Sequence, residues 1–292
     1  MKNKIFYAAL AVIIAFSLIF NSCRKDKDEN ETYDVSAAGD DALAENIFND
    51  IFTQVKDGMK KTEDTIYGSK DISSIMSDSS IITISPCITL TIIPFNTTWP
   101  KNLIIDFGSS NCQQNPPSGR YRRGKILVHC TGRYRTVGSV FTTTVDNYYV
   151  DDNKVEGTKT VTNTGYNIDT NLVFSIHIID AVITKPNNGG TIHWNSDRER
   201  EWINGESTIL NPWDDEYSIT GTQNGISANG KSYNITITSP LNVKIDCRWV
   251  RSGTLDLNIQ DVPTIAVDYG NGNCDANAVA TVNGVSYPFI MN

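Results

Sequence analysis

Apolar and polar residues alternate along most of the chain after residue 80, and this pattern restricts the fold more than any other feature. Leu255, Leu257 and Ile259, for example, are each separated by one polar residue. A strand with this period of two buries one face and exposes the other. Turn-forming pairs such as Asn283-Gly284 separate the strands, without a helical pattern between them. Strands joined by such short turns pair antiparallel.

The sequence therefore predicts a mainly β fold with one large antiparallel, twisted sheet. Residues 81–292 contain no obvious linker, so we expect them to form a single domain. Residues 172–183 are apolar on both faces, which favours a central position in the sheet. Several predicted strands reach about ten residues, and sheets with such strands curl into a barrel or fold into a sandwich. The pattern leaves both of these forms open.

Two stretches repeat one plan, in which a cysteine precedes one β-run and another cysteine follows the next run. Cys87 and Cys112 enclose the first pair of runs, and Cys247 and Cys274 enclose the second. In an antiparallel hairpin these two positions lie at the same end, which permits the disulfides Cys87–Cys112 and Cys247–Cys274. Cys130 shares a strand face with apolar residues, so we expect a buried free thiol there.

One helix is predicted before the sheet, in a segment of helix and loop over residues 37–80. The apolar residues of this helix recur at helical spacing and form a single stripe. Asp40 and Asp41 stand near its start and Lys60 and Lys61 near its end, as the helix dipole favours. We expect the stripe to cover a face or an end of the sheet. Its members are Ala44, Ile47, Phe48, Ile51, Phe52, Val55 and Met59.

The N-terminus has the plan of an export signal. Lys2 and Lys4 precede an apolar run over residues 5–20, which is short for a membrane span. Ser22 then stands directly before Cys23, as in the site where bacterial lipoproteins are cleaved and acylated, for example with palmitate. Residues 1–22 are thus a predicted lipoprotein signal peptide and Cys23 the predicted lipidation site. The alternatives are an ordinary secretory signal and an uncleaved anchor.

Charged residues follow Cys23 at once, and residues 23–36 are predicted to be a solvated tether. The chain as a whole has a net charge of −8, and removal of the signal peptide with its two lysines makes it more negative. This balance argues against a nucleic-acid partner, because phosphate binding needs a positive field.

The most distinctive chemistry lies in residues 193–202, where aromatic and charged residues alternate. Tryptophan stacks on sugar rings and guanidinium groups bind hydroxyls, so one interpretation is a glycan-binding strand face. The other is a ladder of charges and aromatic rings on an exposed sheet, and this one we favour. The candidate glycan-binding residues are Trp194, Arg198, Arg200, Trp202 and, further along the chain, Trp213.

The sequence contains no motif of a catalytic nucleophile, a metalloprotease or a phosphate-binding loop. It has no Cys-x-x-Cys pair, and its three histidines are scattered. We therefore predict neither catalytic residues, nor a metal site, nor a cofactor. A hydrolase is the least favoured alternative.

Several motifs together resemble a group of Bacteroidota lipoproteins. The resemblance covers nearly the whole chain and implies lipidation and an envelope location, without any assigned activity or catalytic residues. In that group, charged and acidic residues after the acylated cysteine direct export to the outer face of the outer membrane. The motifs are Cys23, the acidic helix, Trp99-Pro100-Lys101, Ile105-Asp106-Phe107-Gly108 and residues 119–125, 147–150, 156–162 and 268–274.

From these features we expect a non-enzymatic binding or structural module. It would be anchored in the outer membrane through acylated Cys23 and face the cell exterior. The alternative is a glycan-binding surface lipoprotein, and its partners would be a polysaccharide or a surface protein.

Overall fold

The computed structural model describes residues 33–68, 77–113, 119–208 and 211–291. The predicted signal peptide, Cys23 and residues 24–32 of the predicted tether lie outside these residues. Asp34–Asn292 forms one compact unit. The helix and the strands, which the sequence pattern separates into residues 37–80 and 81–292, thus belong to the same folded body.

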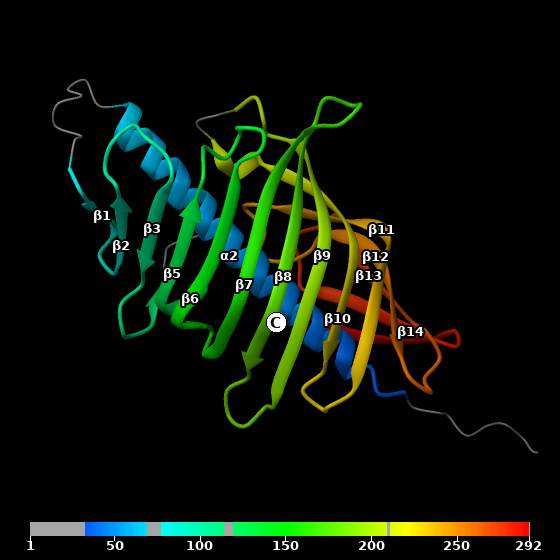
Figure 1. Cartoon of the computed structure of the whole chain (residues 1–292). Coiled ribbons are helices and arrows are strands. Elements are labelled where there is room, and N and C mark those ends of the chain that lie inside the picture. The colour runs from blue at the N-terminus through cyan, green and yellow to red at the C-terminus, as the bar shows by residue number, and fades with distance from the viewer. Residues whose placement is uncertain (1–32, 69–76, 114–118, 209–210, 292) are drawn as a thin grey trace, which may run out of the picture. The chain divides into compact units, whose positions relative to one another are not determined.

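The strands form one antiparallel sheet, which confirms the predicted mainly β fold (Figure 1). Neighbours in the sheet follow the order of the chain, except that the short β4 pairs beside β5. The strands are Ser80–Ser85 (β1), Ile88–Ile93 (β2), Lys101–Asp106 (β3), Cys112–Gln113 (β4), Tyr121–Cys130 (β5), Val140–Val150 (β6), Asn153–Tyr166 (β7), Leu172–Thr184 (β8), Thr191–Asn204 (β9), Glu216–Ile226 (β10), Ser232–Lys244 (β11), Ser252–Ile259 (β12), Ile265–Asn271 (β13), Asn277–Val282 (β14) and Val285–Ile290 (β15).

The sheet is open, because β1 and β15 stand at its two ends and do not pair with each other among the described residues. Of the two forms that the sequence left open, the closed barrel is therefore not adopted. Strand β8 lies in the middle of the sheet, between β7 and β9, as its two apolar faces predicted.

One α-helix, α2, spans Ser36–Tyr67 and crosses one face of the sheet obliquely (Figure 1). Its N-terminal part lies near β10, and its C-terminal part reaches β2 and β3, where a Cβ added at Gly58 would lie 3.1 Å from Ile105. The predicted stripe is the centre of the core, since all seven of its apolar side chains are buried. The prediction that the stripe covers a face of the sheet is thus confirmed.

The helix differs from the prediction in length and in the role of its acidic residues. It begins four residues before Asp40, so Asp40 and Asp41 are not in its first turn. Both are buried and bind other parts of the chain instead: Lys185, in the turn after β8, donates to Asp40 at 2.9 Å, and Trp194 on β9 donates to Asp41. The helix also continues to Tyr67, which shortens the loop predicted after residue 61.

Glycines at β-bulges bend the strands around the helix. The pairing of β5 with β6 shifts register between Arg123 and Lys125, and Gly124 lies at this shift with a φ of +85°. A Cβ on Gly124 would lie 2.1 Å from the backbone oxygen of Asn147, so only glycine fits. Bulges increase the local twist and bend the bulged strand, which lets a large sheet curve around a helix.

Both predicted disulfides are present, and each closes one of the two predicted hairpins. Cys87–Cys112 encloses β2 and β3, and Cys247–Cys274 encloses β12 and β13. Cys130 is free and buried, as predicted.

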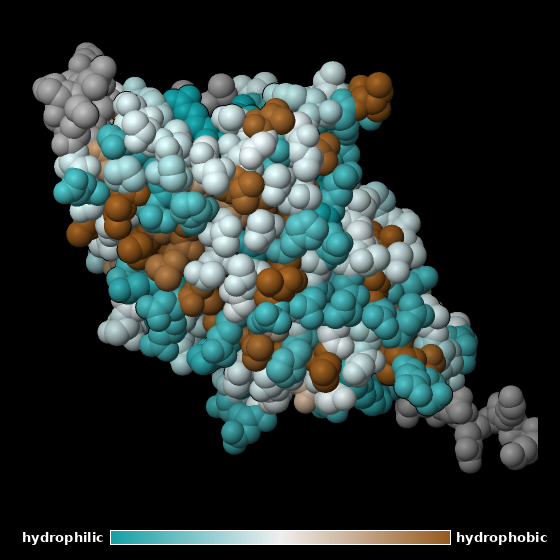
Figure 2. Space-filling model, in the orientation of Figure 1, coloured by the Kyte–Doolittle hydropathy of each residue, from teal (hydrophilic) through white to brown (hydrophobic). Residues whose placement is uncertain are grey.

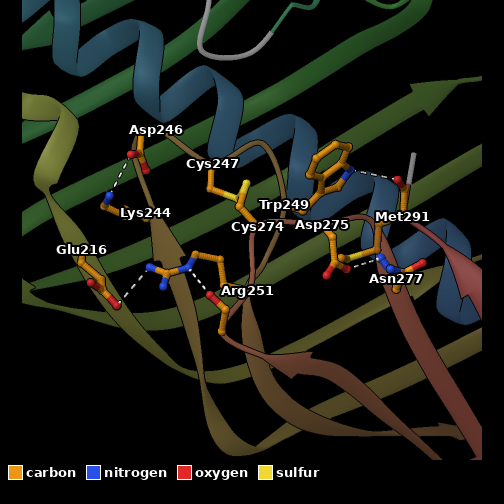
Figure 3. Close-up of a disulfide and its surroundings, with 11 residues drawn as sticks. Glu216, Lys244, Asp246, Cys247, Trp249, Arg251, Cys274, Asp275, Asn277 and Met291 are labelled. Carbon is orange, nitrogen blue, oxygen red and sulfur yellow. Dashed lines mark hydrogen bonds and ion pairs between the residues drawn. A yellow bond between two sulfur atoms is a disulfide. The ribbon is translucent and has the colours of Figure 1, made fainter.

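The segment between β11 and β12 covers the side of the helix that faces away from the sheet, and it carries the second disulfide (Figure 3). Trp249 in this segment donates its indole N–H to the backbone oxygen of Met291 at 3.0 Å. Arg248 binds Asp151, in the turn between β6 and β7, at 3.0 Å. The C-terminal strands are thereby joined to the middle of the sheet across the helix.

The outer face of the sheet mixes polar and apolar residues without one large apolar area in the view of Figure 2. Single apolar side chains such as Ile179 are exposed there among polar neighbours such as His177 and Asp197. Scattered exposure of this kind is usual for a folded protein surface.

Candidate functional site

Four of the five candidate glycan-binding residues lie inside the protein, so the prediction of a surface platform is wrong for them. Trp194, Arg198, Arg200 and Trp202 are between 1% and 4% exposed on the face of β9 that meets the helix. The opposite face of β9, with His193, Asp197 and Glu199, is exposed. The alternation in β9 was interpreted correctly, but its arginine and tryptophan face is the buried one.

The arginines are buried because the helix supplies carboxylates to pair with them. Arg198 binds Glu45 at 2.6 Å, and Arg122 on β5 forms a two-pronged ion pair with Asp50. Burial alone would raise the pKa of Asp50, but the guanidinium of Arg122 outweighs it and holds this pKa below its usual range. These pairs join helix to sheet over more than one turn of the helix.

Asp41 makes the corresponding contact near the start of the helix, and no cationic side chain among the described residues forms an ion pair with it. It accepts hydrogen bonds from the indole N–H of Trp194 at 2.9 Å and from the amide of Gln223 at 2.7 and 2.8 Å. Burial, followed by repulsion from Glu45, raises the pKa of Asp41 to about 7. Trp194 is thus a structural hydrogen-bond donor.

Lys159, on β7, is buried beneath the helix and donates to the backbone oxygen of Phe48 at 2.9 Å. Burial lowers the pKa of Lys159 to about 7, and the nearby Arg200 adds to this effect.

Lys56 lies at the centre of the group of side chains that we consider the best candidate site. Its ammonium binds both Asp215 and the hydroxyl of Tyr217, and its Nζ lies 4.0 Å from the ring centroid of Trp202. Burial lowers the pKa of Lys56 to about 7, although the carboxylate of Asp215 opposes this shift. Burial also raises the pKa of Asp215, in spite of the attraction of Lys56. Shifted pKa values of this kind are frequent at functional sites.

A pocket of about 110 Å³ opens beside Lys56. We call it the Lys56 pocket. The helix, the loop between β5 and β6 and the region between β9 and β10 contribute to its walls. It is lined by Lys56, Met59, Lys60, Glu63, Asp64, Tyr134, Arg135, Trp202, Thr208 and Asp215.

Trp213 is the one candidate glycan-binding residue that is exposed, at 38%. It lies on the short 3₁₀ helix η2, Pro212–Asp214, and lines a second pocket of about 30 Å³ between the helix and residues 243–248. It is not among the residues that line the Lys56 pocket.

Sequence reasoning missed Lys56, Asp215 and Tyr217 as a group. The position of Lys56 in the sequence does indicate burial. It stands four residues after Phe52 and three before Met59, within the buried stripe. A lysine at such a position needs a buried partner. The partners follow it by about 160 residues, and only the fold brings them to it.

Among the described residues, no group of three or more histidine, cysteine, aspartate or glutamate side chains could hold a metal ion. Within the same residues, no helix has the length and the apolar composition needed to cross a membrane. Comparison with known proteins gave no match to a family model, to a curated protein or to a solved structure.

Proposed function

We propose that this chain is a lipid-anchored protein of the bacterial outer membrane, facing the cell exterior, whose folded body is a binding or structural module and not an enzyme. The motif at Cys23 and the charged residues that follow it support the anchor. The resemblance to Bacteroidota lipoproteins supports the same location.

The observation that carries the non-enzymatic part of the proposal is the use of the buried charges. Two buried arginines, one on β5 and one on β9, pair with carboxylates of the helix: Arg122 binds Asp50 and Arg198 binds Glu45. Removal of one partner from such a buried pair is costly, so these groups have a structural role that accounts for their presence.

The anchor is tested with the Cys23→Ala variant of the full chain, expressed in a Bacteroidota host. We expect radiolabelled palmitate to be incorporated into the wild type and not into Cys23→Ala, and the variant to leave the detergent phase on phase separation. Cys130→Ala is the matched control, since it removes the free buried thiol and leaves Cys23 in place. A variant without Cys23 that still partitions with the membrane would contradict the proposed anchor.

The exposed location is tested by protease treatment of intact cells, with lysed cells as the control. We expect the folded body to be cleaved, or released from its tether, on intact cells. Complete protection until lysis would place the protein in the periplasm and overturn the proposed orientation.

A further inference from the structure

We propose that Lys56 and Asp215 condense to form an intramolecular amide bond that joins the helix to the sheet. The bond links Nζ of Lys56 to Cγ of Asp215, which stands directly before β10. The chain modifies itself in this step, once per molecule, so the reaction is compatible with a module that is not an enzyme. The inference goes beyond the proposed function and does not depend on the lipid anchor.

The two reacting groups are in direct contact and buried. Nζ of Lys56 binds Oδ2 of Asp215, and the two side chains are 9% and 2% exposed. The ring centroids of Trp202, Tyr217 and Tyr134 lie 4.0, 5.0 and 5.7 Å from Nζ and keep bulk water away from it. In every other lysine–carboxylate ion pair among the described residues, the lysine side chain is at least 23% exposed.

Burial favours the uncharged forms that react. An ammonium has no lone pair and a carboxylate is a poor electrophile, so the condensation needs an amine and a carboxylic acid. Burial lowers the pKa of Lys56 to about 7 and raises the pKa of Asp215, although the attraction between the opposite charges opposes both shifts. A lysine that is removed from water in this way can act as a nucleophile.

The carboxyl group is held in place beside the amine. A side chain at Gly205 would collide with Oδ1 of Asp215, so this oxygen is packed closely against the backbone. Ile245 donates its backbone N–H to the backbone oxygen of Asp215 at 3.1 Å and fixes the residue from another direction. Groups that a fold holds together in this way react as if they were present at a very high concentration.

The unpaired oxygen of Asp215 also fits an amide better than a carboxylate. Oδ1 is buried and has no hydrogen-bond partner among the described residues. In a carboxylate this oxygen carries part of a negative charge, and a buried charge without a hydrogen bond is costly. In an amide it is a neutral carbonyl oxygen, and the buried ammonium is removed at the same time.

The reaction balances without another reactant. One proton moves from Nζ to Oδ2, and the lone pair of Nζ then attacks Cγ to form the C–N bond. The C–O bond to Oδ2 breaks, and Oδ2 leaves as water with the first proton and a second one from Nζ. The third ammonium proton stays on the amide nitrogen. The Lys56 pocket, of about 110 Å³, adjoins both residues and has room for the released water.

The hydroxyl of Tyr217 is placed to carry the second proton. It binds Nζ of Lys56 and thus touches the reacting nitrogen. A hydroxyl can accept one proton while it releases another, which is the property that a proton carrier needs.

The test is mass spectrometry of the full chain, purified in detergent, reduced and alkylated, and then digested with trypsin. The bond predicts a joined peptide of residues 28–60 and 201–231, uncut after Lys56 and lighter than its two parts by the mass of one water. Without the bond, residues 28–56 and 201–231 appear as separate peptides. A wild-type protein that gives only the separate peptides would overturn the proposal.

Lys185 and Asp40 are the matched control in the same sample. They form an ion pair at 2.9 Å, but the side chain of Lys185 is 32% exposed, so water reaches the amine. We expect no joined peptide from this pair. Joined peptides from both pairs would contradict a reaction that depends on burial, and would show that the link forms while the sample is handled.

A second measurement does not require the variant to fold. Lys56→Arg keeps the positive charge but cannot form the amide bond. After reduction of the disulfides, the wild type should migrate faster than Lys56→Arg on a denaturing gel, because the bond closes a loop between residues 159 positions apart. Lys185→Arg should migrate as the wild type does. Equal mobility of all three proteins would contradict the bond.

The role of Tyr217 is tested with Tyr217→Phe, which we expect to lower the fraction of joined peptide several-fold. Tyr148→Phe is the control, because Tyr148 is also a buried tyrosine of the sheet and does not line the Lys56 pocket. The two variants are compared in preparations with the circular dichroism spectrum of the wild type. Equal fractions in both would overturn the role of Tyr217 as proton carrier.

The outcome is separable from that of the proposed function. The joined peptide contains neither Cys23 nor the signal peptide, so its presence does not depend on the anchor or on the side of the membrane. An amide nitrogen does not titrate near neutral pH. Any contribution of Lys56 to the pH dependence of stability therefore comes from molecules in which the bond has not formed.

Discussion

Buried charged residues give the helix a defined position against the sheet. Each of three buried carboxylates on the helix has its own partner on the sheet. Asp41 accepts hydrogen bonds from Trp194 and Gln223, Glu45 binds Arg198, and Asp50 binds Arg122. A helix shifted along its axis by one turn would leave these carboxylates opposite the wrong groups. Buried ion pairs contribute little net stability compared with apolar packing, but their disruption is expensive, so they select one arrangement over others.

The first prediction concerns Asp50. Asp50→Asn leaves Arg122 buried without its carboxylate, and we expect the free energy of unfolding to fall by about 3–5 kcal/mol. Urea denaturation measures this change. Asp64→Asn is the control, because its pair with Lys60 is exposed and its loss should cost less than about 1 kcal/mol. Equal effects of the two substitutions would show that the buried pair does not position the helix.

The second prediction uses Lys159, whose pKa falls from its usual 10.5 to about 7 in the folded protein. Between these values the unfolded chain holds a proton that the folded protein has lost, so stability rises with pH. Lys159→Met should remove this contribution and reduce the slope between pH 7.5 and 9.5 by up to about 1.4 kcal/mol per pH unit. Lys56 has a similarly lowered pKa and keeps part of the slope in the variant.

The measurement is the free energy of unfolding from urea denaturation at several pH values in this window. Lys154→Met, which removes a half-exposed lysine from the same strand, should keep the wild-type slope. A Lys159→Met protein with an unchanged slope would mean that Lys159 stays charged in the folded state.

At the scale of the residue, the sequence identified which side chains share a face but not which face is buried. Arg198 and Arg200 carry full charges, and a sequence pattern alone places such residues in solvent. The partner that makes the burial of Arg198 possible is Glu45 on the helix, about 150 residues earlier. Arg200 donates to the hydroxyl of Tyr134, in the loop between β5 and β6, and lies over the ring of Phe52 on the helix. A pattern with a period of two contains no information about that distant pairing.

At the scale of the element, the bulges control the curvature of the sheet, and the third prediction concerns Gly124. Gly124→Ala should destabilise the protein more than Gly138→Ala, because a Cβ at Gly124 would lie 2.1 Å from the backbone of Asn147. Gly138 has nearly the same φ, +83° against +85°, and open space around it. It should therefore show only the conformational cost, roughly 1–2 kcal/mol. Similar melting temperatures for the two variants would show that the bulge tolerates a side chain.

The elements themselves were largely predictable, because their signals are local. The two cysteine-enclosed hairpins and the apolar stripe of the helix depend on spacing within about 30 residues. The end of the helix was predicted too early, at its pair of lysines. Thr62, with an Oγ1 that binds the backbone oxygen of Gly58, and the buried Ile66 continue the helix beyond that point.

At the scale of the whole molecule, helix and sheet share one core, and this leads to the fourth prediction. We expect the far-ultraviolet signal of the helix and the fluorescence of the buried tryptophans to change together on urea denaturation, in a single transition. Two separate midpoints would show that the sheet keeps its structure without the helix. The same measurement with the disulfides reduced shows whether cooperativity depends on them.

The choice between an open and a closed sheet was not accessible from the sequence, because it depends on contacts that join distant parts of the chain. Arg248 reaches Asp151 across about 100 residues, and the segment after β11 covers the helix. Strand patterns predict that strands adjacent in the chain pair with each other, as nearly all of them do in this sheet. They do not predict how far the sheet curves.

The position of the helix at the start of the chain has a consequence for how the protein is made. A chain that is synthesised and exported from its N-terminus delivers α2 first, yet the groups that bind it, from Arg122 to Gln223, arrive up to about 180 residues later. Native contacts of such long range form slowly, because the entropy of loop closure must be overcome before they stabilise the fold. If the chain is exported as proposed, the helix therefore cannot take its native position while most of the chain is still on the inner side of the membrane. On that proposal, the delay would keep the polypeptide unfolded enough to pass through a narrow export channel until its last strands have crossed.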